Sequence, residues 1–372
     1  MDTRDVAFVD DLKARAEAGD MMALKPKPRQ TIADPACGTG GFLLAGHDYI
    51  VEPGRYDLDR DDKRFLRDEA FHGIELVDNT ARLCAMNLFL HGIGGASFDA
   101  KPCIEVRDGL ATPPSTHYDL VLANPPFGKK SSITMVGADG DSSSDSDLAV
   151  SRPDFWATTS NKQLNFVQHI VRMLKIGGSA AVVVPDNVLF EGGAGAKIRE
   201  RLMHECDLHT ILRLPTGLFY AQGVKANVLF FDRKAASETP WTKEVWVYDF
   251  RTNHNFTLKT RQLKRSNLDG FVEAHRPGDR SKRVESEQFK KWSYEEIAKR
   301  DGFNLDIWAS VKDESLTDAA SLLPADEIAA QIVERLSSAL EKFQLVAAEL
   351  QGDGGKDTVE PDGVEALLPA DG

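Results

Sequence analysis

The chain has 372 residues, of which 42% are hydrophobic and 28% are charged, and its formal net charge is -13. This is the composition of a globular protein, and the length suits one large domain with attachments or two domains. No apolar run approaches the roughly 18 residues that a membrane helix needs, and residues 1–20 are too acidic and polar for a signal peptide. Four scattered cysteines without a C-x-x-C pair favour reduced thiols over disulfides or a zinc site. We therefore expect a cytoplasmic protein that holds no metal and contacts no membrane.

The charge is unevenly distributed along the chain. Residues 326–372 carry 11 acidic and 3 basic side chains, whereas residues 251–291 carry 11 basic and 5 acidic ones. A local basic stretch can bind phosphates even when the whole chain is acidic. A solvated loop surface is the simpler interpretation of residues 251–291, and a nucleic-acid contact is the alternative.

From residue 31 onward, short apolar runs alternate with segments of helical periodicity. Strands are expected at 31–35, 71–76, 103–109, 118–126 and 179–185. Helices are expected at 41–50, 79–93 and 163–174, the last with Gly177–Gly178 as its stop and with Phe166, Val167, Ile170, Val171 and Leu174 on one face. This alternation predicts an α/β fold with a parallel sheet covered on both faces. Residues 209–215 and 225–234 are consecutive strands without a helix, which predicts an added antiparallel hairpin.

Three further segments stand outside this alternation. Residues 129–156 are rich in Ser, Asp and Gly, which predicts a mobile loop. In residues 332–350 the apolar side chains are spaced by 4, 3, 4, 3 and 4 positions, at Ile332, Leu336, Ala339, Phe343, Val346 and Leu350. This is the seam of a helix that packs either on its own domain or on a partner. Residues 352–372 are acidic, contain Gly and Pro, and are expected to be disordered.

The sequence TIADPACGTGGFLL (31–44) predicts a ligand site. A strand ends at Asp34, a glycine-rich turn follows, and a helix begins near Gly41. In an open parallel sheet the ligand lies at such a strand end, where small residues let it approach the backbone. The spacing CGTGG differs from the dinucleotide fingerprint, and the Lys-Ser/Thr of a phosphate loop is absent. We therefore expect a nucleoside-type ligand without a phosphate clamp, beside Asp34, Ala36, Cys37, Gly38, Thr39, Gly40 and Gly41.

Two carboxylates at the ends of the next strands are candidates for the same ligand. Glu75 is placed to accept both ribose hydroxyls, as an acid at the second strand's end does in this topology. Its alternative role is to cap the helix that starts near Asp78. Asp108 is placed to accept from an adenine amino group, and its alternative is a turn aspartate before Gly109.

The sequence LVLANPPFG (120–128) carries a second motif. Prolines fix φ and lack an N–H, so they end the strand and present Asn124, Pro125, Pro126 and Phe127 on a rigid tip. In isolation this motif is a rigid turn with an asparagine cap. Beside the glycine-rich turn it indicates an active site.

Together, the two motifs resemble those of the DNA adenine-N6 methyltransferases, which use S-adenosylmethionine. DPACGTGGFL, NPPFG, LKIGGSAAVVVPDNVLF, LPTGLFYAQGVKANVLFFD and YDFRTN are similar to the modification subunit of type I restriction–modification systems, over roughly residues 31–350. The resemblance implies a Rossmann-like, seven-stranded methyltransferase sheet with an antiparallel C-terminal hairpin and a C-terminal helical extension. It also implies that S-adenosylmethionine binds at the glycine-rich turn, Glu75 and Asp108.

The resemblance further implies a mechanism at the tip. The adenine amine is a poor nucleophile because its lone pair is conjugated into the ring. Asn124 Oδ1 and the Pro125 carbonyl are expected to accept its two hydrogens and free the lone pair for attack on the sulfonium methyl. Phe127 is expected to stack on the adenine, which must leave the double-stranded DNA. No nucleophilic cysteine is needed, so Cys37 also serves as a small core residue.

The resemblance implies partners and a division of the chain. Family members carry a long helical N-terminal region that ends in Gly-Gln-aromatic-Phe-Thr-Pro, and we expect it to be missing here because only 30 residues precede Thr31. Expected partners are a specificity subunit, a second modification subunit and a restriction subunit. The expected parts are an N-terminal remnant (1–30), a methyltransferase domain (31–235), a basic accessory region (236–320), a partner-binding helix (321–350) and an acidic tail (351–372).

Two other functions stay open at this point. One is a non-catalytic assembly protein that keeps the fold and the partner helix. The other is a protein-glutamine or RNA methyltransferase, which can share the Asn-Pro-Pro-aromatic tip. Phe rather than Tyr at position 127, together with LPTGLF and GVKANVLFF, favours DNA.

Overall fold

The computed structural model describes residues 25–95, 102–127, 149–218, 225–251, 256 and 262–307. The chain divides into two compact units, Met1–Lys312 and Asp313–Gly372, and all of the described residues lie in the first. The expected helix at 332–350 and the tail after it therefore lie outside the described residues. So do residues 129–148 of the expected mobile loop.

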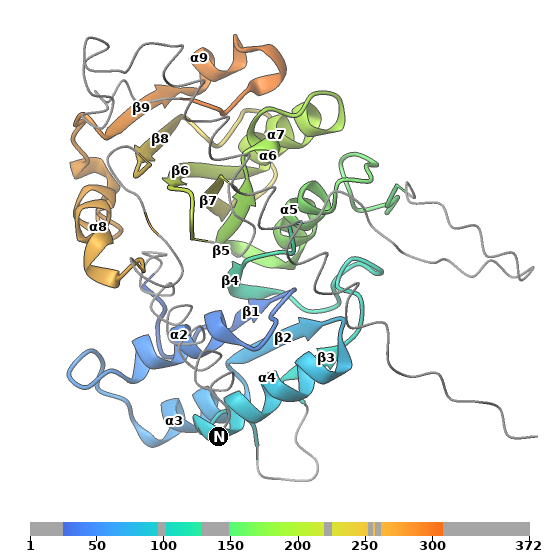
Figure 1. Ribbon diagram of the computed structural model, residues 1–372, viewed down its shortest axis with the longest axis vertical. Helices are drawn as coiled ribbons and strands as arrows, with labels where there is room; N and C mark the ends of the chain where they lie inside the picture. The colour runs from blue at the N-terminus through green and yellow to red at the C-terminus, as the bar shows by residue number, and fades with distance from the viewer. Residues whose placement is uncertain are drawn as a thin grey trace, which may run out of the picture. The chain divides into compact units, whose positions relative to one another are not determined.

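The described residues form a nine-stranded mixed sheet (Figure 1) in the order β3-β2-β1-β4-β5-β7-β6-β8-β9. The strands are β1 (Ile32–Asp34), β2 (Phe71–Glu75), β3 (Ile104–Val106), β4 (Tyr118–Ala123), β5 (Leu174–Pro185), β6 (Cys206–Leu214), β7 (Ala226–Arg233), β8 (Glu244–Asp249) and β9 (Phe289–Ser293). Strands β1 to β5 are parallel to one another, and β7 lies antiparallel between β5 and β6. The parallel sheet and the antiparallel hairpin that the sequence predicts are thus confirmed.

The described sheet has nine strands instead of the expected seven. Strand β8 pairs with β6 in parallel, and β9 pairs with β8 antiparallel. Both strands come from the range 236–320, which the sequence suggested as an accessory region. The boundaries of the expected parts remain a prediction, but this range contributes to the same sheet.

Helices cover both faces of the sheet, as the alternation predicts. They are α2 (Gly41–Val51), α3 (Arg60–Asp68), α4 (Asp78–Leu90), α5 (Lys162–Met173), α6 (Asn187–Phe190), α7 (Ala194–Glu205), α8 (Asp269–His275) and α9 (Tyr294–Ala298), with short 3-10 turns η1 (Arg265–Leu268), η2 (Arg280–Lys282) and η3 (Asp301–Phe303). Helices α2, α3, α4 and α8 pack on one face and α5, α6, α7 and α9 on the other. The switch of faces follows from right-handed crossovers, because the chain moves outward from β1 to β3 and then returns through β4 to β5.

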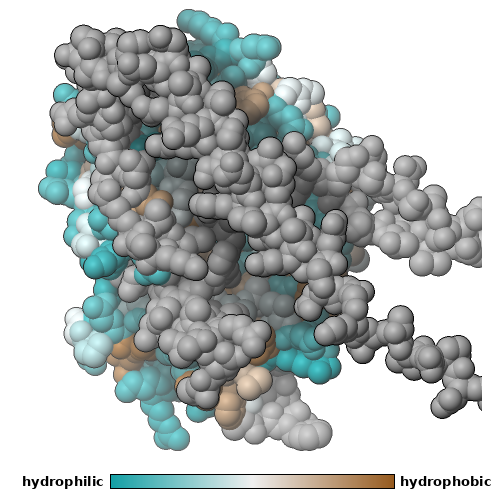
Figure 2. Space-filling model, viewed as in Figure 1, coloured by the Kyte–Doolittle hydropathy of each residue, from teal (hydrophilic) through white to brown (hydrophobic). Residues whose placement is uncertain are grey.

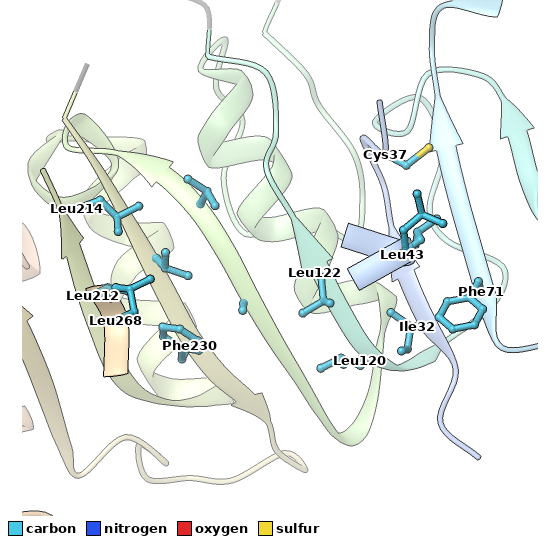
Figure 3. Packing of buried hydrophobic residues seen from close by; sticks show 14 of the residues in the cluster. Ile32, Cys37, Leu43, Phe71, Leu120, Leu122, Leu212, Leu214, Phe230 and Leu268 are labelled. Carbon is cyan, nitrogen blue, oxygen red and sulfur yellow. The ribbon is translucent and has the colours of Figure 1, made fainter. Parts of the chain in front are cut away.

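Alternate residues of each strand fill two separate cores. On β4, Leu120 and Leu122 enter the first core while Val121 and Ala123 enter the second. Figure 3 shows the first core, where Ile32 and Phe71 lie near Leu43 of α2. Burial of these side chains on both faces stabilises the sheet by roughly 25 cal/mol per Å² of apolar surface removed from water.

Helix α5 is more deeply buried than predicted. The expected apolar face is buried, and so are the polar residues Gln163, Asn165, Gln168 and His169. Two of these amides bind the backbone of the segment before the helix: the Gln168 amide exchanges two hydrogen bonds of 2.9 and 3.1 Å with Ala157, and the Asn165 amide donates to the Thr159 carbonyl at 2.9 Å. Burial of these amides is tolerated because they are hydrogen-bonded.

The predicted stop of that helix is wrong. Helix α5 ends at Met173, so Leu174 already begins β5, and Gly177–Gly178 lie inside that strand. Gly177 has a φ of 86°, which a side chain would disfavour. The two glycines therefore shape the beginning of a strand.

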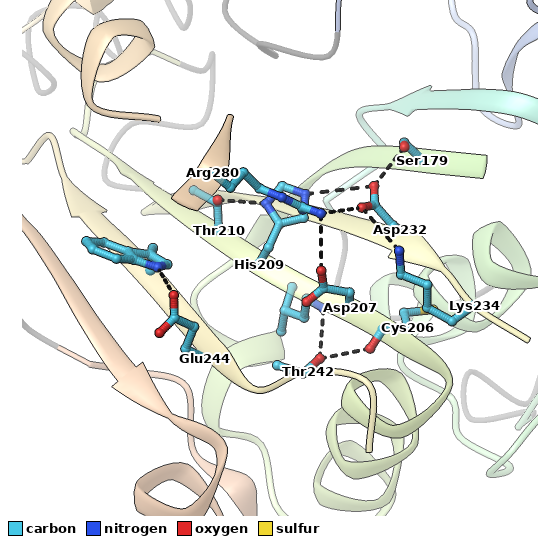
Figure 4. A network of polar contacts seen from close by, with 12 residues as sticks. Ser179, Cys206, Asp207, His209, Thr210, Asp232, Lys234, Thr242, Glu244 and Arg280 are labelled. Carbon is cyan, nitrogen blue, oxygen red and sulfur yellow. Dashed lines mark hydrogen bonds and ion pairs between the residues drawn. The ribbon is translucent and has the colours of Figure 1, made fainter. Parts of the chain in front are cut away.

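A polar network joins the basic stretch to the sheet (Figure 4). Arg280 lies 2.9 Å from Asp232 and 3.3 Å from Asp207, and Ser179 donates to Asp232 at 2.7 Å. Next to it, buried Arg283 donates to the carbonyls of two buried histidines, His275 at 2.7 Å and His209 at 3.1 Å. Burial lowers the pKa of His275 to about 3 and that of His209 well below its usual value. These two arginines of the basic stretch thus face the protein.

Hydrophilic side chains cover most of the described surface visible in Figure 2, with isolated apolar patches between them. Helix α4 carries exposed apolar residues, namely Leu83, Met86, Phe89 and Leu90. None of the helices in the described ranges combines the length and the hydropathy that spanning a membrane requires.

Candidate active site

The parallel strands bring the predicted site residues to one edge of the sheet. Strands β3, β2, β1 and β4 are adjacent and parallel, so the chain leaves each of them at the same edge (Figure 1). Asp108 follows β3, Glu75 ends β2, Asp34 ends β1 and Asn124 follows β4. The helices change faces between β1 and β4, which is the switch point where open α/β sheets bind ligands.

The glycine-rich turn is held by backbone contacts and by α4. Its Cys37 N–H donates to the Ile74 carbonyl at 3.0 Å, and Asn87 of α4 donates to the Thr39 carbonyl at 3.0 Å. Gly38 and Gly40 have φ values of 55° and 88°, in the region that favours glycine. Helix α2 then begins at Gly41, as predicted.

Asp34 lies at the base of this turn and is 2% exposed. One carboxyl oxygen accepts from the Ala36 N–H at 2.9 Å. Burial raises the pKa of Asp34 to about 7, and the nearby Glu75 carboxylate adds to the effect. The side chain is therefore partly protonated at neutral pH.

Two sulfur atoms fill the space beneath the turn. Cys37 and Cys84 are buried free thiols whose sulfurs lie 3.8 Å apart. A Cβ on Gly73 would lie 2.7 Å from the Cys37 sulfur, and one on Gly40 would lie 2.8 Å from the Cys84 sulfur. The hydrogen bond with Cys84 and burial raise the pKa of Cys37 far above its usual range. This supports its interpretation as a small core residue that shapes the turn.

Glu75 connects the turn to the start of α4. One oxygen accepts from the Gly38 N–H at 3.0 Å and the other from the Val77 N–H at 2.9 Å. The second bond matches the alternative role of Glu75 in capping α4, because Val77 is the N-cap residue of that helix. Each carboxylate oxygen has a further lone pair, so the predicted ribose contact remains a prediction that these bonds allow.

Asp108 is half-buried in a tight turn next to Glu75. One of its oxygens accepts from the Leu110 N–H at 2.8 Å, which is the turn role given as its alternative, and the other accepts no hydrogen bond from the described residues. A Cβ on Gly109 would lie 2.8 Å from the Pro35 carbonyl, so this turn packs closely against the glycine-rich turn. The adenine contact of Asp108 remains a prediction.

The Asn-Pro-Pro-Phe tip begins directly after β4 ends at Ala123. Asn124 and Phe127 are half-buried, Pro125 is buried and Pro126 is exposed. The Asn124 amide makes no hydrogen bond to the described residues, and Phe127 packs partly against the first core. The arrangement leaves the Asn124 amide able to accept from a ligand.

Two residues of this edge were not identified from the sequence. Leu76 directly follows Glu75 and is 64% exposed, which suits an apolar contact with a planar ligand. An apolar residue immediately after a strand-end carboxylate is a signal that could have found it. Gln163 of α5 donates to the Pro126 carbonyl at 2.8 Å. No local pattern indicates that contact, because the two residues are 37 positions apart.

Comparison with known proteins decides the family. A profile described as N-6 DNA methylase matches residues 20–319. The chain belongs to the N-6 DNA methylase family. Within it, this chain is 38% identical to the EcoKI methylase subunit, a type I restriction enzyme subunit of Escherichia coli strain K12, over 366 residues. That match covers 88% of the chain but 65% of the relative, so the chain spans somewhat less than two thirds of the relative's length.

Solved structures of type I modification subunits also match this chain. The crystal structure of the EcoKI M protein matches with a TM-score of 0.67 and 35% identity, over 90% of this chain and 72% of that chain. A modification subunit of a putative type I restriction enzyme from Vibrio vulnificus matches with a TM-score of 0.64 and 28% identity, over 82% and 60%. The resemblance to type I modification subunits is thereby confirmed.

Proposed function

We propose that this chain transfers a methyl group from S-adenosylmethionine to the N6 amine of adenine in DNA, as the modification subunit of a type I restriction–modification complex. The proposal rests on one juxtaposition: the strand ends of β3, β2 and β1 and the tip after β4 meet at one sheet edge in a chain of this family. On this reading β1 to β7 are the seven strands of the methyltransferase sheet, and β8 and β9 are additions.

The chemistry of the acceptor groups at this edge fits the adenosine part of S-adenosylmethionine. Glu75 would accept ribose hydroxyls, and the second oxygen of Asp108 would accept from the adenine amine. Exposed Leu76 would pack on the adenine ring. When bound, the cofactor supplies an electrophilic methyl group on its sulfonium.

The tip supplies acceptors for the amine of the target base. The Asn124 oxygen and the Pro125 carbonyl would each accept one N–H of adenine, which directs the nitrogen lone pair away from them. Pro125 and Pro126 hold these acceptors because their φ angles are fixed. Acceptors that are in place before the reaction stabilise the charge that develops on the amine without reorganising.

Phe127 is proposed to stack on the target adenine. Inside a duplex the amine is paired, so the base must rotate out before Asn124 can reach it. An aromatic face compensates for part of the lost base stacking. A type I specificity subunit would provide the sequence recognition, and a second modification subunit and a restriction subunit would complete the enzyme.

Substitution of Asn124 tests the proposal. The chain is assembled with a type I specificity subunit, and transfer of a labelled methyl group from S-adenosylmethionine to double-stranded DNA is measured. Asn124→Ala should lower the turnover number by roughly 100-fold or more, as removal of one preorganised hydrogen-bonding group does elsewhere. The dissociation constant for S-adenosylmethionine should change little, because Asn124 addresses the base.

The matched control is Asn267→Ala, which removes an exposed asparagine in η1. It should leave the turnover number unchanged. Equal rates for wild type and Asn124→Ala would remove Asn124 from the mechanism. Labelling of a glutamine peptide or of RNA, with DNA unlabelled, would contradict the proposed substrate.

A further inference from the structure

One rotation in the tip is not fixed by its own sequence. Both prolines fix φ, and Pro126 also restricts ψ of Pro125, because the residue before a proline is confined to extended conformations. The Pro125 carbonyl is therefore fixed. No proline follows Pro126, so its ψ is free to rotate. That rotation turns the peptide plane that joins Pro126 to Phe127 and thereby moves the Phe127 ring.

A buried amide holds this peptide plane. The Gln163 amide nitrogen donates to the Pro126 carbonyl at 2.8 Å, and the side chain is 5% exposed. The bond joins the first turn of α5 to the tip. Because the bonded oxygen belongs to the same peptide plane as the Phe127 nitrogen, holding the oxygen fixes the direction in which Phe127 leaves the tip.

The position of Gln163 is itself determined by the start of α5. The Asn161 oxygen accepts from the N–H groups of Gln163 and Leu164 at 3.0 and 3.2 Å, which caps the helix. The Asn161 amide donates to Glu191 at 2.6 Å, and Glu191 follows α6. The donor of the tip contact is thus anchored to the second face of the sheet by a chain of hydrogen bonds.

We propose that Gln163 is a positioning residue that orients Phe127 toward the flipped adenine by fixing ψ of Pro126. The inference rests on the proposed function, because the orientation of Phe127 affects catalysis only if Phe127 stacks on the target adenine. Gln163 acts through Phe127, whereas the Asn124 and Pro125 acceptors stay in place without it. Loss of Gln163 should therefore weaken the productive placement of the base while cofactor binding stays the same.

The first test observes Phe127 directly and needs no catalysis. 4-Fluorophenylalanine is incorporated at position 127 of the full chain, and its ¹⁹F signal is compared between wild type and Gln163→Leu. A single narrow signal in wild type should broaden or split in the variant, because the ring samples several directions. An unchanged signal overturns the inference.

The second test uses activity of the complex with a specificity subunit. Gln163→Leu should lower kcat/KM for DNA by about tenfold, within the roughly 5- to 150-fold range that loss of a base–aromatic contact spans, with an unchanged dissociation constant for S-adenosylmethionine. In the background of Phe127→Ala, the same change should cost less than about twofold. Equal losses in both backgrounds would mean a general structural effect and would overturn the inference.

Two more variants separate positioning from folding. Gln168→Leu removes another buried amide of α5, whose partner is Ala157 and not the tip. It should lower the melting temperature without altering the ¹⁹F signal of Phe127. Gln163→Glu keeps the shape and regains a donor only when protonated, so its activity relative to wild type should rise as the pH falls. A flat ratio across pH contradicts the hydrogen-bond role.

The failure of this inference is distinguishable from failure of the proposed function. If the wild-type complex does not methylate DNA, the proposed function fails, and the ¹⁹F comparison still decides whether Gln163 orients Phe127. If the wild type methylates DNA and the ¹⁹F signal of Phe127 is unchanged in Gln163→Leu, only the inference fails.

Discussion

Replacing Asp34 by asparagine is expected to stabilise the folded protein above pH 7. Burial raises the pKa of Asp34 to about 7, from an ordinary value of 3.8. Because the folded state binds this proton more tightly than the unfolded state, the contribution of Asp34 to stability is most favourable below pH 4 and is lost as the pH rises toward 7. Each pH unit between the two values is worth about 1.4 kcal/mol, so the cost at pH 8 is about 4 kcal/mol. Asparagine keeps an acceptor for the Ala36 N–H and has no charge to bury.

Urea unfolding of wild type and Asp34→Asn between pH 4 and pH 9 measures this cost. The difference in unfolding free energy should be near zero at pH 4, grow up to pH 7 and then stay constant. Asp119→Asn is the control of opposite sign. Burial alone would raise the pKa of Asp119, but hydrogen bonds from Lys175 and Thr31 lower it, so its charge stabilises the fold above pH 4. A pH-independent difference for Asp34→Asn would refute the reasoning.

Three further predictions concern stability. Gly73→Ala should lower the unfolding free energy by about 1–3 kcal/mol, because the new Cβ would lie 2.7 Å from the Cys37 sulfur, which already contacts the Cys84 sulfur. Gly192→Ala, whose new Cβ would meet nothing within 4 Å, is the control in the same thermal melt. Neutral His275 should make the protein sensitive to acid, because burial lowers its pKa to about 3. Its contribution to stability is therefore lost as the pH falls below about 6.5. His275→Gln should make the melting temperature depend less on pH between pH 7 and pH 4. Asn161→Ala should cost about 1 kcal/mol by removing the cap of α5, and an unchanged urea midpoint would contradict that role.

The strands that position the site could be predicted because their signals are local. Each is a short apolar run that ends in small or turn-forming residues, and parallel topology then dictates that their carboxyl ends share an edge. This is why the sequence alone assigns the glycine-rich turn, Glu75, Asp108 and the tip to one edge of the sheet. Their roles toward ligands are not decided by that placement.

The strands β8 and β9 and the buried amides of α5 depend on long-range contacts. Strand β9 reads FKKWS, whose charges resemble those of a surface loop, and only its pairing with β8 makes it a strand. Gln163, Asn165 and Gln168 have the residue types of an exposed helix face. They are buried because residues 149–161 fold back over α5 and because the tip supplies a carbonyl that binds Gln163. No local sequence pattern predicts either contact.

Full or partial burial of the native cysteines allows a newly introduced, exposed cysteine to be labelled selectively. Cys37, Cys84 and Cys206 are buried, and burial raises the pKa of Cys103 and Cys206, so little reactive thiolate is present at neutral pH. A cysteine in place of Ile176, which is 68% exposed, would meet a maleimide first. Ile176 lies at the amino end of β5, so a fluorophore there occupies the sheet edge opposite the tip. Such a dye would report the arrival of DNA or of another subunit by distance-dependent energy transfer while the candidate site stays unobstructed.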